Sequence, residues 1–325
     1  MLRGLERERE IPFEELAEII EQAIQTAYVR HAENQGLSVP PTEEVRVTLD
    51  RKSGEISVLV PEHDDEDNII GEAYVTTDEF GRVASSAAKQ VINQRLRDLS
   101  DDAVLGQFKD KEGQVVSGVI QQGPNPRMVH IDLGEVEAIL PPEEQVPGEN
   151  YAHGTRVRVY VTSVSKGLKG PQIIVSRTHP GLVRKLFERE VPELGEGLVE
   201  IVSLAREAGH RSKVAVRAKQ AGINAKGTCI GEMGSRVRAV MSELGEEKID
   251  IVDYSPELPK FVANALSPAK VTDVFMINES LKQVRALVPD FQLSLAIGKE
   301  GQNARLAAKL TGAKIDIQPD SIMND

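Results

Sequence analysis

Hydrophobic residues in the first hundred positions switch from a helical period to alternation and back. Residues 12–34 place apolar side chains every three or four positions, and their acidic first turn suits a helix N-terminus. Apolar and polar residues then alternate on both sides of residues 52–54, which predicts a hairpin. A second helical pattern covers 83–99. Together these elements predict an acidic α+β domain over residues 1–105.

The next segment contains short alternating runs separated by Gly and Pro. Five runs read QVVSGVI, RMVHIDL, VEAILP, RVRVYVTSV and QIIVSR. Five strands in so short a segment are typical of a small Greek-key barrel of the OB type, as in the ribosomal S-one barrel. We assign this barrel to residues 106–180.

The rest of the chain contains one pattern twice. Each copy predicts helix, strand, strand, helix, helix, strand, over residues 181–254 and residues 255–325. Ile-Gly-x-x-Gly occurs at 230–234 and again at 297–301, and a Lys-Ile-Asp-Ile run follows each copy. A repeat of this length indicates a duplicated domain. We call the two copies the first repeat and the second repeat.

The Gly-x-x-Gly segment between two helices has a specific chemical use. Glycine lets the backbone bend tightly and leaves no Cβ on the side that a ligand approaches. The next helix presents N–H groups and the positive end of its dipole, which favour a phosphate backbone. One such segment is also compatible with a plain helix-turn-helix that has a glycine cap. Two copies in this order of elements favour KH domains of type II, which clamp about four nucleotides of single-stranded RNA.

The candidate RNA-binding residues lie in these loops and in the helix turns that follow. In the first repeat they are Ile230, Gly231, Glu232, Met233, Gly234, Ser235, Arg236 and Arg238. In the second repeat they are Ile297, Gly298, Lys299, Glu300, Gly301, Gln302, Asn303 and Arg305. The isoleucine before each loop is expected to line the groove where bases lie. Only the second loop has a basic residue, so the first is expected to depend on its following helix.

The predicted barrel has few groups that could stack on bases. No Phe, Tyr or Trp occurs between Phe108 and Tyr151. Only His130 could stack there, and a surface histidine on a strand is an equally good interpretation. Because stacking contributes ~1–3 kcal/mol per base, we expect the barrel alone to bind RNA weakly.

The net charge of −12 argues against nucleic-acid binding until its distribution is considered. Residues 1–105 contain 23 acidic and 11 basic residues, whereas residues 106–325 contain 28 of each. From Arg206 to Arg238 the balance is +6, which predicts either a phosphate-binding surface or a solvated face. The acidic first domain is expected to bind a basic protein surface and not RNA.

Patterns for catalysis and metal binding are missing from the sequence. The six histidines never reach ligand spacing, and no Cys-x-x-Cys or Walker loop occurs. The acidic run at 62–67 is expected to be a solvated loop. We therefore predict no enzyme activity, no metal and no cofactor.

Nothing in the sequence predicts a membrane segment. No apolar run approaches the ~18 residues that a membrane helix needs, and the N-terminus lacks the apolar region of a signal peptide. The single cysteine, Cys229, suits a reducing cytoplasmic setting and is expected to be a small core residue.

An acidic α+β domain, an OB barrel and two type II KH domains resemble the NusA family of bacterial transcription factors. The most specific phrases are REVPELGEGLVEI, ELGEEKIDIV and LAIGKEGQNARLAAKLTG. The resemblance implies that the first domain docks on RNA polymerase and that the barrel and KH pair hold single-stranded nascent RNA. It also implies effects on pausing, termination and antitermination, with other antitermination factors as partners.

Two other classes remain as alternatives. A ribosome-associated KH/OB protein is one, although such proteins are generally basic. A subunit of an RNA-degrading enzyme is the other, although the chain has no room for a large catalytic core.

Overall fold

A computed structural model of the chain describes residues 13–36, 41, 44–50, 53, 55–63, 69–75, 78–123, 125, 127–167, 170–245 and 247–323. The chain splits into two compact units, Met1–Ala103 and Val104–Asp325, which we describe separately. Among the described residues, no helix has both the length and the apolar character that crossing a membrane requires.

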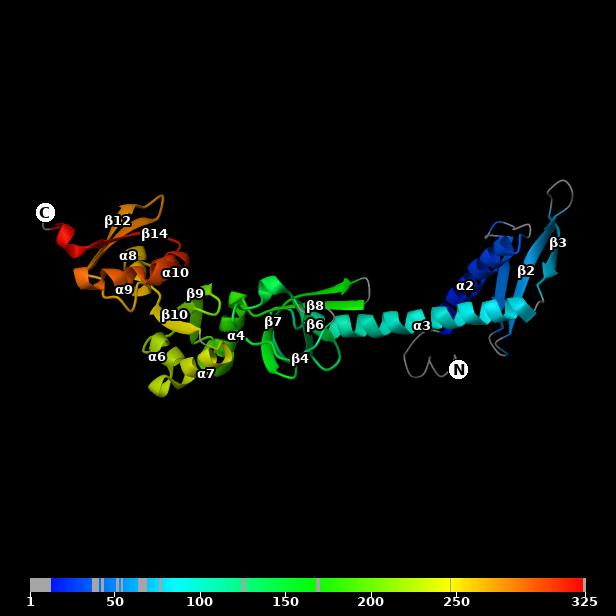
Figure 1. Cartoon of the computed structure of the whole chain (residues 1–325), viewed down its shortest axis with the longest axis horizontal. Helices are drawn as coiled ribbons and strands as arrows, with labels where there is room; N and C mark the ends of the chain where they lie inside the picture. The colour runs from blue at the N-terminus through cyan, green and yellow to red at the C-terminus, as the bar shows by residue number, and fades with distance from the viewer. Residues whose placement is uncertain are drawn as a thin grey trace. The chain divides into compact units, whose positions relative to one another are not determined.

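The N-terminal unit packs helices on a three-stranded antiparallel sheet of order β1-β2-β3 (Figure 1). Its elements are α2 (Phe13–Asn34), β1 (Arg46–Leu49), β2 (Ile56–His63), β3 (Ile69–Tyr74) and α3 (Asp78–Lys109). The apolar stripe of α2 meets the inward side chains of β1 and β2, which confirms the predicted first helix and hairpin. Strand β3 is an addition to the prediction. Most of the acidic run at 62–67 lies outside the described residues.

The predicted second helix is the middle of a longer one. Helix α3 extends beyond 83–99 at both ends and runs across the predicted domain boundary at residue 105. Near its C-terminal end, Phe108 is buried in the core of the barrel that follows.

The barrel closes in the order β4-β5-β6-β8-β7. Its strands are β4 (Val115–Gln121), β5 (Val129–Asp132), β6 (Glu137–Leu140), β7 (Arg156–Gly167) and β8 (Gly170–Ser176). Alternate residues such as Ile120, Ile131 and Val159 fill the interior. All five predicted strands and the OB-like closure are confirmed.

The two repeats have the same fold. The first contains α4 (Pro180–Glu190), α5 (Pro192–Gly195), β9 (Val199–Glu207), β10 (Arg211–Ala218), α6 (Ala225–Ile230), α7 (Ser235–Glu243) and β11 (Lys248–Asp253). The second contains α8 (Leu258–Ala265), β12 (Asp273–Asn278), β13 (Gln283–Val288), α9 (Leu293–Ile297), α10 (Gln302–Thr311) and β14 (Lys314–Pro319). In each, the last strand runs parallel to the central strand and the first runs antiparallel to it. This is the predicted type II arrangement.

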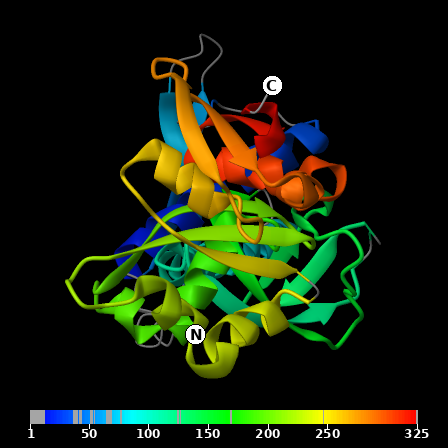
Figure 2. The same cartoon turned by 90° about the vertical axis from the view of Figure 1, so that its left-hand side faces the viewer.

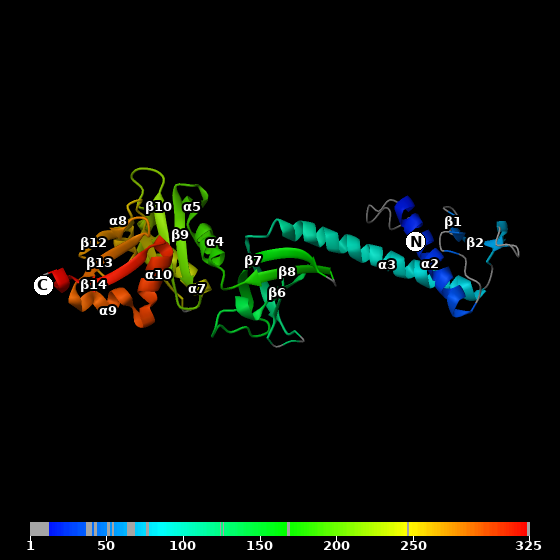
Figure 3. The ribbon, with the colours of Figure 1, turned by 90° about the horizontal axis from the view of Figure 1, so that it is seen from above.

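The repeats are stacked so that helices of the second cover the sheet of the first (Figure 3). Ala205, Ala215 and Val252 of the first sheet share a core with Phe261 and Leu306 of α8 and α10. Polar contacts reinforce this junction, because Ser203 Oγ donates to Leu310 O at 3.0 Å and the buried Lys213 Nζ donates to Ser267 O at 2.7 Å. Strand β12, at the edge of the second sheet, instead carries exposed apolar side chains (orange in Figure 2).

Candidate nucleic-acid interface

The two glycine loops, residues 231–234 and 298–301, have the same backbone conformation. Gly231 has φ 75° and ψ 170°, and Gly298 has φ 79° and ψ 169°. The third residue of each loop is left-handed although it is not glycine, with φ 50° at Met233 and φ 54° at Glu300. The two copies of the sequence motif therefore have matching backbone torsion angles.

The first glycine of each loop is required by packing behind the loop. A Cβ on Gly298 would lie 2.8 Å from both Cβ and N of Asn303, and one on Gly231 would lie 2.7 Å from Arg236 Cγ. These contacts let the loop fold back onto the helix that follows it. We had expected both glycines to make room for a ligand, and for the first glycine the packing gives a different reason.

The second glycine of each loop faces open space. No described atom lies within 4 Å of a Cβ placed on Gly301, and the nearest to Gly234 is Arg238 Nη1 at 3.7 Å. Both glycines have positive φ and form the N-cap of α10 and α7, and no side chain caps either helix. The positive end of each helix dipole is thus open on the side where the loop lacks a side chain.

Side chains around the first loop divide into exposed and anchored groups. Met233 is 85 % exposed, and Ser235 and Arg238 are also exposed. Arg236 points back into the repeat, where Nη1 donates to Glu193 Oε2 and to Thr228 O, both at 2.9 Å. Arg236 therefore fastens the loop to its own repeat, and an RNA contact by its charge stays a prediction.

Asn303 in the second repeat is likewise a structural residue. It is only 3 % exposed. Its Nδ2 donates to Leu266 O at 3.0 Å and to Ala296 O at 2.9 Å, so it ties α10 to the segments before it. The burial corrects our prediction of a direct RNA contact by this side chain.

Glu207 of the first repeat accepts hydrogen bonds from two candidate RNA-binding residues of the second repeat. Arg305 Nε donates to Glu207 Oε1 at 2.6 Å, and Gln302 Nε2 donates to Glu207 Oε2 at 3.0 Å. The hydrogen bond from Arg305 lowers the pKa of Glu207 below its ordinary value of 4.5.

Lys299 is exposed and forms no ion pair with any residue that the structure describes. Its charge is therefore available to a ligand.

A groove of about 660 Å³ runs between the two repeats beside the second loop. The second repeat contributes Leu295, Gly298 and Lys299 to its lining. The first repeat contributes the β9–β10 turn with His210 and Arg211, together with Lys248. The second loop thus opens onto a surface built by both repeats, which sequence analysis did not identify.

The basic stretch from Arg206 to Arg238 is largely neutralised inside the protein. Its ion pairs are Arg206–Glu247, Arg211–Asp250, Lys213–Asp250, Arg217–Glu200, Lys219–Glu200 and Arg236–Glu193. The acidic partners lie outside the stretch, so a local count of charges missed them. The balance of +6 therefore does not translate into an open positive surface.

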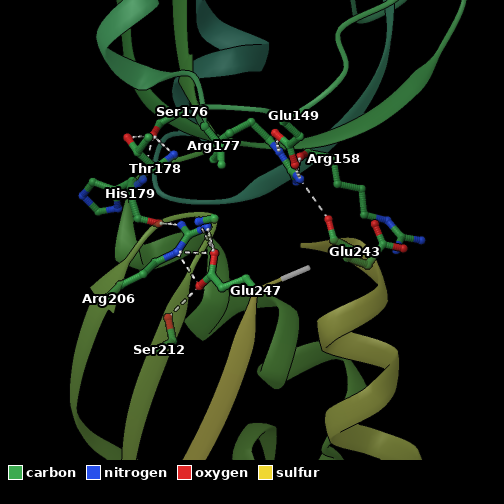
Figure 4. Close-up of polar contacts among 12 residues, drawn as sticks. Glu149, Arg158, Ser176, Arg177, Thr178, His179, Arg206, Ser212, Glu243 and Glu247 are labelled. Atoms are coloured by element: carbon green, nitrogen blue, oxygen red, sulfur yellow. Dashed lines mark hydrogen bonds and ion pairs between the residues drawn. The ribbon is translucent and has the colours of Figure 1, made fainter. Parts of the chain in front are cut away.

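A polar network joins the barrel to the first repeat (Figure 4). Arg177 bonds Glu149 within the barrel, and its guanidinium also donates to Glu243 O in the first repeat at 2.9 Å. Arg158 of β7 forms a second bridge to the Glu243 carboxylate. These contacts cross from barrel to repeat within the C-terminal unit.

An adjoining ion pair is almost completely buried. Arg206 Nη2 and Glu247 Oε2 lie 2.8 Å apart, with 3 % and 0 % of their side chains exposed. Arg206 also donates to His179 O, and Glu247 also accepts from Ser212 Oγ and Gly209 N (Figure 4). Burial alone would raise the pKa of Glu247, but the hydrogen bonds and the Arg206 charge hold that pKa below its ordinary value. Through His179, the cluster holds the first repeat to the segment that leads from the barrel into α4.

The barrel histidine is held in place by its neighbours. His130 Nδ1 lies 2.5 Å from Glu137 Oε1, and the side chain is only 15 % exposed. The ring also covers Gly123, where a Cβ would lie 2.2 Å from His130 Cδ2. Of our two interpretations, this arrangement favours the strand histidine and not a base-stacking platform.

The described residues contain no group of three or more His, Cys, Asp or Glu side chains that could hold a metal ion. Cys229 is fully buried in the first repeat, and burial raises the pKa of its thiol to about 11. It is a core residue, as predicted, and its thiolate form is strongly disfavoured at neutral pH.

Comparison with known proteins identifies the family. Residues 1–63 match the NusA N-terminal domain, residues 177–254 the NusA-like first KH domain, and residues 258–325 the NusA-like second KH domain. The transcription termination/antitermination protein NusA of Mycobacterium tuberculosis is 52 % identical over 98 % of this chain and 92 % of its own length. The chain belongs to the NusA family. The NusA proteins of Bacillus subtilis and Thermus thermophilus are 46 % and 38 % identical, over 98 % and 99 % of this chain and 89 % of each of their own lengths.

Membership in the NusA family confirms the resemblance inferred from the KH phrases. The family matches to the two repeats also agree with the type II KH fold in both. The exact domain boundaries at 105, 180 and 254 stay predictions.

Proposed function

We propose that the protein is a transcription termination and antitermination factor that docks on RNA polymerase and holds nascent single-stranded RNA. Its family carries this activity in name. The pair of glycine loops carries the RNA-binding part of this proposal. Each loop leads into a helix whose N-terminus has no side-chain cap, and the second glycine of each loop faces open space. Such a loop suits a phosphate backbone, because backbone N–H groups and the helix dipole both favour negative charge.

The RNA-binding assignment centres on the residues that remain exposed. Among them are Lys299, which lines the groove, and Ile297 in the second repeat, and Ser235, Met233 and Arg238 in the first. Glu232 and Glu300 are also exposed, and Arg305 is exposed but bonded to Glu207. Because the two repeats share one core, a single RNA strand could reach both loops without ordering a flexible linker between them. Binding then avoids part of the entropy cost that separate domains would incur.

The N-terminal unit is proposed to bind polymerase. Its charge of −12 would repel RNA phosphates and suit a basic protein surface. Under this proposal the protein acts in the cytoplasm with the polymerase, and other antitermination factors join the same complex.

The division of roles can be tested with two fragments that follow the two compact units, residues 1–103 and residues 104–325. We expect the first to retain polymerase binding without RNA binding, and the second to retain RNA binding while losing most polymerase binding. Equal polymerase affinity of the second fragment and the full chain would contradict the proposal. Circular dichroism of each fragment serves as the folding control.

The alternative classes have their own tests. Shortening of labelled RNA by the full chain with magnesium would support an RNA-degrading function. Purification with ribosomes and not with polymerase would support a ribosome-associated one. We expect intact RNA and association with polymerase.

A further inference from the structure

Phe291 exposes an aromatic ring to solvent beside the second glycine loop. The residue is 82 % exposed. It lies in the short turn Asp290–Gln292, directly before α9, the helix that ends at the loop. A large apolar side chain so open to water usually serves a contact with a partner.

The segment that carries Phe291 ends at the second glycine loop. Leu293 and Ala296 face inward and pack with Ala269 and Val288. Phe291 lies in the turn two residues before α9, and Leu295 lies in the middle of α9. Leu295 is 46 % exposed and lines the groove with Gly298 and Lys299. Two exposed apolar side chains, Phe291 and Leu295, thus precede the loop that carries Lys299.

The first repeat shows that the fold does not need exposed apolar side chains at these two positions. Aligning Cys229 with Ala296 places Asn224 at the position of Phe291 and Thr228 at that of Leu295. Asn224 caps α6 by accepting from Gly227 N at 2.9 Å. The same backbone unit therefore forms with polar residues at both positions, and the aromatic ring is specific to the second repeat.

We infer that Phe291 is a stacking platform for a base of the RNA strand whose backbone is held at Gly298–Gly301. Single-stranded RNA is bound best where aromatic faces for bases lie beside cationic groups for phosphates. Phe291 and Lys299 supply these two features in one segment of the second repeat, whereas the barrel histidine is held by its neighbours. A purely apolar protein partner would make no use of the adjacent lysine and open helix N-terminus. The inference rests on the RNA-binding function proposed above.

The chain contains no tryptophan, so Phe291→Trp places a single fluorescent ring at the proposed contact. Titration of the full-length variant with single-stranded RNA should quench its emission, because a stacked base replaces water at the ring. Phe291→Ala should weaken binding by about five- to 150-fold, as expected from the ~1–3 kcal/mol of one base stack. Its melting temperature should stay near that of the parent, because the ring is exposed.

Two controls separate stacking from general damage. Phe275→Ala removes an exposed ring on β12, a strand that contributes no residue to the groove, and should leave RNA affinity unchanged. Phe291→Ala should also leave the salt dependence of binding unchanged, because it removes no phosphate contact. An RNA with one abasic position should lose affinity for the parent protein but not for Phe291→Ala when that position is the stacked one.

Three results would overturn the inference. Unchanged affinity of Phe291→Ala, while the parent binds RNA, would show that the ring serves another contact and would leave the proposed function intact. Unaltered emission of Phe291→Trp at saturating RNA would have the same meaning. Failure of the parent chain itself to bind single-stranded RNA would overturn both the stacking site and the RNA-binding function.

Discussion

The first glycine loop places Glu232 and Met233 between its glycines and the second places Lys299 and Glu300 there, yet their backbone torsions agree within a few degrees. What the loops share is the packing of the first glycine against the next helix and the open side of the second glycine. The loop shape is thus set by contacts behind it. The side chains in front are free to differ, so one backbone can serve two different surfaces.

A second difference lies at the start of the last strand of each repeat. The first repeat buries Arg206, Ser212 and Glu247 together. The equivalent register positions in the second repeat are Met276, Val284 and Ala313. Only the first repeat adjoins the barrel there, as the bond from Arg206 to His179 O shows. The polar cluster is therefore part of a joint between domains and not a requirement of the repeat fold.

Glu247→Ala should produce the largest effect, because it leaves Arg206 buried without its partner. We expect a loss of about 3–5 kcal/mol in the free energy of unfolding of the C-terminal unit. The double variant Arg206→Met, Glu247→Ala copies the apolar residues of the second repeat and should recover much of that loss. Urea unfolding of the full chain measures both. A double variant no more stable than Glu247→Ala would show that the cluster does more than bridge two domains.

Three paired carboxylates, of which Glu247 lies in this joint, should make stability depend on pH. The folded-state pKa values of Glu247, Asp250 and Glu207 are all lowered, so their contribution is complete above the ordinary carboxyl values of 3.8–4.5. It is lost as the pH falls through the folded values. The urea midpoint of the C-terminal unit should therefore decrease below about pH 4.5. The double variant at Arg206 and Glu247 should show a weaker decrease. An equal decrease in parent and variant would contradict a role for Glu247.

Alanine substitutions at Gly298 and Gly301 should distinguish a glycine required by packing from a glycine that leaves room for RNA. Gly298→Ala collides with Asn303 and strains a backbone that is essentially restricted to glycine, so we expect a loss of roughly 1–3 kcal/mol in stability. Gly301→Ala meets no described neighbour and should cost only the ~1–2 kcal/mol of a left-handed residue. Both should weaken RNA binding. Thermal melts and RNA titrations on the two variants compare these losses, and a lower melting temperature for Gly301→Ala than for Gly298→Ala would reverse the assignment.

Lys299→Asp should weaken RNA binding and leave the fold intact. The substitution replaces an unpaired positive charge with repulsion beside a phosphate. The slope of log affinity against log salt should flatten by about 1, because one counterion-releasing contact is lost. Met233→Asp at the first loop, which has no basic residue, should weaken binding less. Titrations at several salt concentrations, with melting temperature as control, decide this. Equal effects of the two variants would mean that the loops contact RNA alike.

Arg236→Ala should have the smallest effect, and a different kind of effect. Because Arg236 bonds Glu193 and Thr228 O, we expect a stability loss of about 1 kcal/mol and little change in the salt slope of RNA binding. Arg238→Ala is the matched control, since Arg238 is exposed on the same helix and should flatten the slope. A flattened slope in Arg236→Ala would support our original prediction for that residue.

The order of helices and strands was predictable because it depends on local patterns. The five barrel strands follow alternation, and the repeat of Ile-Gly-x-x-Gly identified both KH domains. Strand β3 was missed because its run IIGEAY has no regular alternation, and its ends are open to solvent. The extent of α3 was missed because its flanking turns are polar.

The roles of single side chains were less predictable. Arg236 and Asn303 have the residue types expected at an RNA contact, and only the fold shows that they point inward. The ion-pair partners of the basic stretch lie between 17 and 43 residues away, on other strands and helices, so no local count includes them. The barrel joint and the groove between repeats likewise depend on contacts between distant segments.

The central claim is that the two repeats form one surface for a single RNA strand. The most direct test compares binding of one long single-stranded RNA, able to reach both loops, with its two half-length pieces, using the full chain at fixed salt. We predict clearly tighter binding of the long RNA, and that Lys299→Asp removes most of this advantage while hardly affecting a piece bound at the first loop. Equal affinities for the long RNA and its halves would contradict a shared surface.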